Sequence, residues 1–206
     1  MKKTETSIDG AYVIQVKRFG DDRGFFMESF NLKEFQHEIG GYKFVQDNHS
    51  LSTGGVLRGL HYQIIHPQGK LVRCTQGEIF DAIVDLRVDS PTYKKNFTIK
   101  LNRPDLLLWV PPGLAHGFYT VSDTAEFEYK VTDYYYPQYD RTLMWNDKTA
   151  SIMWPFYESW GYPEPLLSKK DQRGLSFDDC QKYDICLLYT SPSPRDATTS
   201  RMPSSA

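Results

Sequence analysis

The sequence predicts a mainly β protein, a sandwich or barrel of short strands with a few short helices. Runs rich in β-branched and aromatic residues recur along the chain, and Pro, Gly, Asn and Asp separate them. Aromatic residues make up 15% of the 206 residues, which suits a β-rich core or a cavity that grips a ring-shaped ligand. This length is enough for one domain with a substantial core.

The first element that we expect is a short helix within residues 31–41. Asn31 is a favourable N-cap residue, and Glu34 follows it three positions later, as in a capping box. A pair of glycines at 40–41 ends the helix. The apolar stripe of this helix consists of Leu32, Phe35 and Ile39.

Strands are expected after this helix. Residues 70–88 hold two β-rich runs that are divided at Gln76 and Gly77. Further runs, each closed by turn-forming residues, lie at 96–102, 105–113, 116–123 and 125–136. This density of short strands and turn signals is typical of an all-β sandwich or barrel.

The alternation of side chains along residues 70–74 predicts an inward lysine. Lys70 shares a face with Val72 and Cys74, so its ammonium points toward the interior. An inward lysine is costly unless it has a partner or a function, such as stabilising a developing oxyanion. A salt bridge from Lys70 to Asp81 or Asp85 is an equally open interpretation.

The same argument predicts that Tyr129 points inward. Tyr129 shares a face with Phe127 and Val131. The opposite, solvated face carries Glu126, Glu128 and Lys130. Taken alone, a buried tyrosine favours a structural role, with its hydroxyl satisfied by a neighbour.

Composition excludes several classes of protein. The net charge of −2 argues against nucleic-acid binding by bulk electrostatics. No zinc spacing or disulfide framework is formed by Cys74, Cys180 and Cys186. The start of the chain lacks the apolar region of a signal peptide, and no apolar run reaches membrane-spanning length. We therefore expect a cytoplasmic protein that contacts neither membrane nor nucleic acid.

The end of the chain differs in composition from the rest. Residues 191–206 are rich in Ser, Thr and Pro and show no apolar periodicity. We expect a single domain over residues 1–180 and a low-complexity tail over 181–206 that is disordered or foreign to the native protein.

The motif around Pro111, Gly113 and His116 resembles the second signature of the cupins, which are small jelly-roll barrels. Many cupins bind a metal through this histidine together with a His-x-His pair. Here the nearest candidate for that pair reads His61-Tyr62-Gln63, which leaves too few ligands for a stable site. The sequence therefore predicts a cupin-like jelly roll that binds no metal.

His61 has three possible roles on sequence grounds. A lone histidine in a β-rich segment is usually a satisfied core residue, and the missing His-x-His disfavours a metal ligand. A catalytic base is the third reading, and inward Lys70 and Tyr129 make a proton-transfer site plausible. Regular alternation puts Arg58 on the opposite face from His61, unless a bulge at Gly59 brings both to one cavity.

Many motifs in order resemble the dTDP-4-dehydrorhamnose 3,5-epimerase family. They run from about Asp9 to about Gly174 and include DDRGFFMESF, QDNHS, GVLRGLHYQ, SPTY, WVPPGLAHGF, EYKVTDYY, WND and LSKKD. The resemblance implies a cupin jelly roll without metal or other cofactor, usually a homodimer. It also implies a place in dTDP-rhamnose and cell-surface polysaccharide (lipopolysaccharide) biosynthesis.

The implied reaction is epimerisation at C3 and C5 of a dTDP-4-keto-6-deoxyhexose, which gives dTDP-4-dehydro-L-rhamnose. The C4 ketone acidifies both neighbouring C–H bonds because the carbanion delocalises as an enolate. The resemblance implies His61 as base, Asp171 as its partner, Tyr129 as acid, and Lys70 near the C4 oxygen. Lys70 is also expected to help depress the pKa of Tyr129.

The resemblance further implies a set of substrate contacts: Arg23, Glu28, Gln46, Asn48, Arg58, His116, Asp140 and Lys170. Asp140 stands where a glutamate is expected. Arg23 and Glu28 of one subunit can reach into the neighbouring subunit's site, so dimerisation is part of this expectation. The loop before Asp171 is longer than usual, so Asp81 and Asp85 remain alternative partners of His61.

Other functions stay open at this point. The same fold could carry a 3-only or 5-only epimerase, a 3,4-ketoisomerase, or a sugar-nucleotide binder without activity. A metal-dependent cupin oxygenase is disfavoured by the missing His-x-His.

Overall fold

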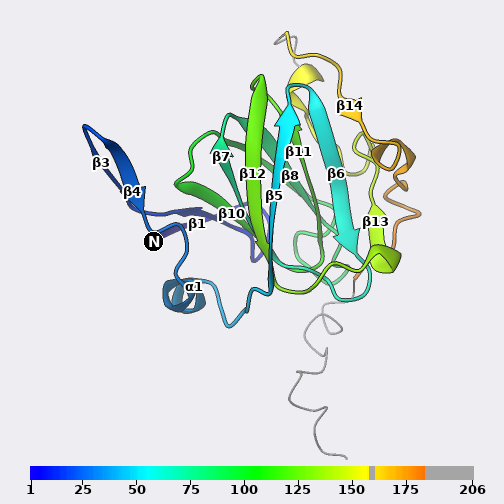
Figure 1. The fold of residues 1–206 in the computed structure, drawn as a ribbon. Helices are drawn as coiled ribbons and strands as arrows, with labels where there is room; N and C mark the ends of the chain where they lie inside the picture. The colour runs from blue at the N-terminus through cyan, green and yellow to red at the C-terminus, as the bar shows by residue number, and fades with distance from the viewer. Residues whose placement is uncertain (158–160, 184–206) are drawn as a thin grey trace, which may run out of the picture.

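A computed structural model describes residues 1–157 and 161–183 of the chain, which form two main antiparallel sheets (Figure 1). The first sheet has the strand order β1 (Lys2–Glu5), β2 (Tyr12–Gln15), β10 (Leu106–Val110), β7 (Lys70–Gln76), β12 (Thr124–Val131) and β5 (Gln46–Thr53). The second has the order β13 (Asp140–Thr142), β6 (Val56–Gln63), β11 (Leu114–Thr120), β8 (Ile79–Asp85) and β9 (Asn96–Leu101). The short β14 (Leu166–Leu167) pairs with β6 in parallel.

Most neighbouring strands in these sheets are far apart in the chain, as in a jelly roll. This arrangement confirms the predicted mainly β, cupin-like jelly-roll barrel. The helices are short, as expected: α1 (Leu32–Glu38) and the 3₁₀ turns η1 (Pro137–Tyr139), η2 (Pro155–Tyr157) and η3 (Asp171–Arg173). Among the described residues, every helix is too short or too polar to cross a membrane.

The interior between the sheets is apolar and is built from both of them. Val72 and Phe127 come from the first sheet, and Ile83 and Phe118 come from the second. All four side chains are at most 4% exposed. Burying one such side chain stabilises the fold by about 1.5–3 kcal/mol, so these inward positions fix the register of their strands.

The strands that carry Lys70 and Tyr129 follow the predicted alternation. Lys70 is 8% exposed and lies on the face of Val72, whereas Leu71 packs in a separate cluster on the other face of the sheet. Tyr129 packs against the interior cluster beside Phe127. Both inward predictions are confirmed.

The predicted helix forms with the predicted cap. The Asn31 side chain accepts hydrogen bonds from the backbone amides of Lys33 and Glu34, which satisfies two amides of the first turn. Of the predicted stripe, Phe35 is fully buried and packs against Trp109. Leu32, the first residue of the helix, is 43% exposed, so the stripe is shorter than the sequence suggests.

A hairpin of β3 (Arg18–Asp21) and β4 (Gly24–Met27) stands away from the barrel as an arm (Figure 1). Its apolar side chains face solvent in this chain, with exposed fractions of 52% for Phe19, 53% for Phe25 and 71% for Phe26. Three exposed phenylalanines on one hairpin form an apolar surface of the kind that marks an interaction site.

The C-terminal part of the chain covers the outer face of the second sheet. Trp154, Phe177 and Tyr183 belong there to one buried cluster with Leu57 and Tyr119 of that sheet. The packed chain therefore reaches at least Tyr183, which is 7% exposed. The predicted domain of 1–180 and tail of 181–206 stay predictions, because residues 184–206 lie outside the described part of the chain.

Candidate active site

A histidine–aspartate pair joins the barrel to the C-terminal segment. His61 on β6 donates a hydrogen bond from Nε2 to Oδ1 of Asp171 at 2.6 Å. The other carboxylate oxygen of Asp171 accepts from the Ser168 hydroxyl at 2.6 Å, and the backbone amide of Gly59 also points at Oδ1, at 3.4 Å. The segment after residue 160 thus returns to the barrel, and Asp171 is the partner of His61.

The alternative partners are engaged elsewhere. Asp81 accepts from His116, and Asp85 forms a buried salt bridge with Arg87, at 2.8 Å between Arg87 Nη2 and Asp85 Oδ2. Hydrogen bonds from Arg87 and Ser90 outweigh the desolvation of Asp85 and lower its pKa. Asp85 is therefore a structural carboxylate at the end of β8.

Asp171 is held as a carboxylate. Burial alone would raise its pKa, but hydrogen bonds from His61 and Ser168 outweigh burial and lower the pKa below its ordinary value. An ionised Asp171 fixes the tautomer of His61 with the proton on Nε2, so Nδ1 is the nitrogen that can accept a proton.

The imidazole of His61 is held in its neutral form. Burial is the main cause that lowers its pKa, and the charges of Lys170 and Lys70 act in the same direction, while Asp171 opposes them. The imidazole is therefore neutral at physiological pH. Its side chain is 32% exposed, so a ligand can reach it.

A bulge at Gly59 brings Arg58 and His61 to the same face. On β11, His116 and Phe118 are two residues apart, but their partners on β6, His61 and Arg58, are three apart. Gly59 has φ of +128°, and a Cβ at this position would lie 2.5 Å from the Cα of Gly117. Glycine is required here, and the bulge that the sequence left as an assumption is present.

Lys70 contacts the backbone of His61. Its Nζ donates a hydrogen bond to the backbone carbonyl of His61 at 3.2 Å. Burial lowers the pKa of Lys70 to about 8, against the opposing pull of Asp140 and Asp81. Lys70 forms no direct salt bridge with Asp81 or Asp85. Its ammonium is held inward by the His61 carbonyl and by the charges of Asp140 and Asp81 at longer range.

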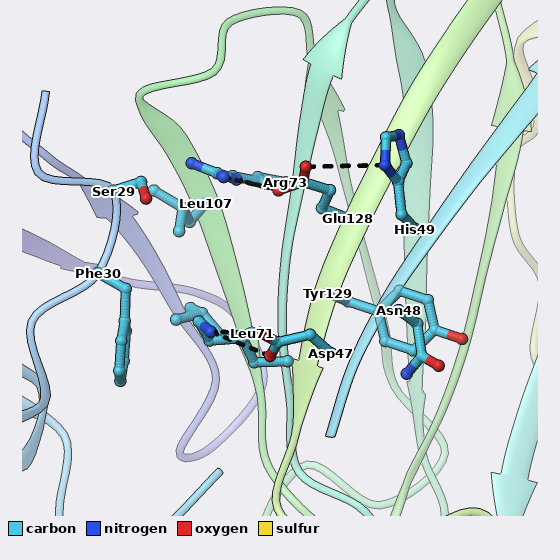
Figure 2. Close-up of a pocket in the computed structure, with 11 residues that line it drawn as sticks. Ser29, Phe30, Asp47, Asn48, His49, Leu71, Arg73, Leu107, Glu128 and Tyr129 are labelled. Atoms are coloured by element: carbon cyan, nitrogen blue, oxygen red, sulfur yellow. Dashed lines mark hydrogen bonds and ion pairs between the residues drawn. The ribbon is translucent and has the colours of Figure 1, made fainter. Parts of the chain in front are cut away.

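Tyr129 lies on β12 opposite Asn48 of β5. Figure 2 shows the two side chains together, on the other side of the sheet from Arg73 and Glu128. Burial raises the pKa of Tyr129, and the charge of Arg58 opposes this only in part. The expectation that Lys70 depresses this pKa is therefore wrong, because desolvation dominates and Arg58 is the opposing cation. A protonated phenol is the form that an acid needs.

His116, expected to contact substrate, has a buried partner of its own. Its Nε2 donates to Oδ2 of Asp81 on β8 at 2.9 Å, and its ring stacks on Phe127 with centroids 5.9 Å apart. Both His116 and Asp81 are nearly inaccessible, and burial raises the pKa of Asp81. In register, His116 lies directly across from His61.

Asp140 and Lys170 meet in an ion pair beside this site. Asp140 Oδ2 also accepts from the hydroxyl of Tyr135 at 2.9 Å. Sequence reasoning missed Tyr135, since a tyrosine in a run of three gives no signal of its own. The charge of Asp140 acts on both Lys70 and Tyr129, so this cluster borders those two side chains.

The remaining predicted contacts divide into two groups. Gln46 and Asn48 lie on β5 and are hydrogen bonded to each other, from Gln46 Nε2 to Asn48 Oδ1 at 2.8 Å. Arg23 and Glu28 belong to the arm and its base. The Arg23 side chain is 89% exposed and pairs with Asp21 of the same hairpin, so it is not assembled with His61 in this chain.

A groove of about 280 Å³ lies on the outer face of the first sheet, beside Ser29 and Phe30 (Figure 2). Its charged groups are paired with each other across neighbouring strands, Arg73 with Glu128 at 2.6 Å and Lys130 with Asp47 at 2.9 Å. Tyr129 and Asn48 also line this groove, whereas His61, Lys70 and Asp171 do not. Within the described residues, no group of three or more His, Cys, Asp or Glu side chains is arranged to hold a metal ion.

Comparison with known proteins gives one consistent family. The family model described as dTDP-4-dehydrorhamnose 3,5-epimerase matches residues 5–179. The curated dTDP-4-dehydrorhamnose 3,5-epimerase of Pseudomonas aeruginosa is 48% identical over 185 residues, which cover 89% of this chain and 99% of the relative.

Solved structures agree in fold. A crystal structure of dTDP-6-deoxy-D-glucose-3,5-epimerase from Legionella pneumophila, in complex with dTDP-4-keto-L-rhamnose, matches with a TM-score of 0.82 and 39% identity, covering 91% of this chain and 96% of that one. A 3'-monoepimerase from Streptomyces bikiniensis, in complex with dTDP-quinovose, matches with a TM-score of 0.76 and 29% identity, covering 84% of this chain and 86% of that one.

Proposed function

This chain belongs to the dTDP-4-dehydrorhamnose 3,5-epimerase family, and on that premise we propose how its residues carry out the reaction. It is a carbohydrate epimerase acting on a dTDP-sugar. The proposed substrate is dTDP-4-dehydro-6-deoxy-D-glucose, and the proposed product is dTDP-4-dehydro-L-rhamnose. The observation that carries the mechanism is the His61–Asp171 hydrogen bond of 2.6 Å.

The first step in this proposal is removal of a C–H proton next to the C4 ketone. Nδ1 of His61 takes the proton. The C–H electron pair forms a double bond between that carbon and C4, and the C4 oxygen takes the negative charge of the enolate. Asp171 then stabilises the imidazolium that forms. The ammonium of Lys70 faces the same interior and stabilises the negative C4 oxygen.

The second step returns a proton to the same carbon from the opposite face. Tyr129 supplies it as a neutral phenol, which its raised pKa supports. The phenolate regains its proton from solvent, and His61 releases the one that it took. Running this sequence at C3 and at C5 inverts both carbons, so atoms and charges balance without a cofactor.

Sequence identity favours epimerisation at both C3 and C5 over epimerisation at one carbon. The chain is 48% identical to a 3,5-epimerase and 29% identical to the 3'-monoepimerase. The discriminating experiment incubates wild-type enzyme with the dTDP-4-keto sugar in deuterated water. We expect deuterium at both C3 and C5 of an L-rhamno product by mass and proton NMR. Label at one carbon only would replace this proposal with a single-position epimerase.

We also propose that the active form is a homodimer in which each arm completes the partner's site. The support is the arm itself, which presents exposed phenylalanines and an exposed Arg23 whose ion pair is with Asp21 of the same hairpin. A cytoplasmic location and a place in cell-surface polysaccharide synthesis are inferred from the family.

Subunit complementation tests the exchanged arm. R23A and H61A are each expected to be nearly inactive alone. Mixed and reassembled in equal amounts, they should recover about a quarter of wild-type activity, because half of the dimers are hybrids with one intact site. A mixture that stays inactive, with hybrids shown by mass spectrometry, would remove the exchanged arm from the proposal.

A further inference from the structure

The side-chain amide of Gln63 makes three hydrogen bonds to backbone groups. Its Nε2 donates to the carbonyl of His66 at 2.7 Å and to the carbonyl of Tyr134 at 3.2 Å, and its Oε1 accepts from the amide of Tyr136 at 2.7 Å. Gln63 itself is 4% exposed. A buried amide that satisfies three groups in two loops fixes the position of both.

Two of the three residues in the turn that Gln63 holds are mostly exposed, while Tyr136 packs against His66 and Tyr139. Tyr134 is 55% exposed and Tyr135 is 51% exposed. A second glutamine holds the middle of the turn, since Oε1 of Gln46 accepts from the amide of Tyr135 at 3.2 Å. Hydrogen bonds from two glutamines therefore hold the backbone of all three turn residues, two of which have little apolar burial.

The two glutamines belong to different sheets. Gln46 begins β5, the last strand of the first sheet, and Gln63 ends β6 in the second sheet. The turn at 134–136 therefore bridges the two sheets beside the proton-transfer residues.

The turn is linked to the charged residues beside the proposed site. The hydroxyl of Tyr135 donates to Asp140, and Asp140 pairs with Lys170, the neighbour of Asp171. Residue 140 also pairs with Gln63 in the register of β13 and β6. Gln63 therefore contacts the turn at 134–136 through its side chain and lies beside Asp140 through the strand pairing. A shift of the turn would move Tyr135 and Asp140 together.

We propose that Gln63 is a positioning residue for this epimerase, which places Tyr135, Asp140 and Lys170 for substrate binding by clamping the turn at 134–136. The inference rests on the proposed function, since these residues border the proposed proton-transfer groups. Gln63 does not take part in proton transfer, so its loss is expected to weaken binding more than it slows the chemical step.

The test is the variant Q63L, which keeps the bulk and removes the amide. We expect KM for the dTDP-4-keto sugar to rise about tenfold, with kcat within about twofold of wild type. The dissociation constant of dTDP alone, measured by calorimetry, is expected to rise in parallel. If Q63L does not fold, Q63E serves instead, because it keeps the acceptor for Tyr136 and loses both donors.

The matched control is Q68L. Gln68 also donates its amide to a backbone carbonyl, that of Asp133 at 2.9 Å, but makes none of the bonds to the turn itself. Its KM is expected to stay within about twofold of wild type. In a Y135F background, Q63L should add less than about twofold to KM, since both changes act through one unit.

Three results would overturn the inference: unchanged KM in Q63L with kcat lowered in proportion to the folded fraction, an equal KM rise in Q68L, or fully additive effects with Y135F. Failure of the proposed function is a different result, namely no turnover by wild type. The dTDP dissociation constants of the variants would then still test the clamp.

Discussion

Two histidine–aspartate pairs lie side by side in the barrel, and they differ in how they are assembled. His61 and His116 face each other across β6 and β11. Asp171 reaches His61 from the C-terminal segment, whereas Asp81 reaches His116 from the adjacent strand β8. His61 is 32% exposed at its side chain and His116 only 7%.

The electrostatics of the two pairs differ in the same sense. The hydrogen bonds to Asp171 overcome its burial and lower its pKa, whereas burial dominates at Asp81 and raises its pKa. A His–Asp pair alone therefore does not identify a base. The pair also needs a well-satisfied carboxylate and an imidazole that a ligand can reach.

The largest expected effect comes from replacing the two histidines in turn. H61N should lower kcat by at least about 10³-fold, because it removes the base while keeping similar size. H116N should act mainly on KM, with kcat lowered by no more than about tenfold, since its ring is buried against Asp81. Steady-state kinetics and dTDP binding measure both. A larger kcat loss in H116N than in H61N would reverse the assignment of the two pairs.

The aspartates are expected to differ less strongly. D171N removes the charge that stabilises the imidazolium and fixes its tautomer, so kcat should fall by about 10²-fold or more. D81N removes a carboxylate that is already costly to bury, so its kcat should stay at least about tenfold above that of D171N. Circular dichroism melts serve as the folding control. Equal kcat losses would show that both carboxylates act in the reaction.

The pH profile of kcat/KM should be a bell. His61 is active when neutral, and its lowered pKa puts the acid limb below the ordinary histidine value of 6.5. Lys70 is active when charged, so activity should fall as pH rises through about 8. K70R should be less active but should move the alkaline limb above about pH 9, since arginine stays charged. If the alkaline limb does not move in K70R, a group other than Lys70 causes the loss of activity at high pH.

Much of the fold and part of the site were predictable from local sequence. Strand alternation placed Lys70 and Tyr129 inward because one face of each strand had to be buried, and the N-cap of Asn31 was readable because capping is local. The bulge at Gly59 was open, because the register shift depends on the contact with Gly117 across the sheet.

Pairings that join distant segments were beyond such reasoning. His61 and Asp171 are 110 residues apart, so only the family resemblance pointed to their contact. Tyr135 and Gln63 gave no signal, since their roles depend on backbone groups of loops that fold together only in three dimensions. The pKa of Tyr129 was misjudged because desolvation cannot be read from residue spacing.

In the proposed mechanism His61 and Tyr129 lie on opposite faces of one sugar ring, and the fate of solvent deuterium in Y129F tests this arrangement. We expect that Y129F still exchanges the substrate's own C–H protons for deuterium with retained configuration, while formation of the inverted product falls sharply. Proton NMR of the sugar in deuterated water separates the two events. Wild-type inversion by Y129F, or loss of exchange together with inversion in a folded variant, would show that the two groups do not act from opposite faces.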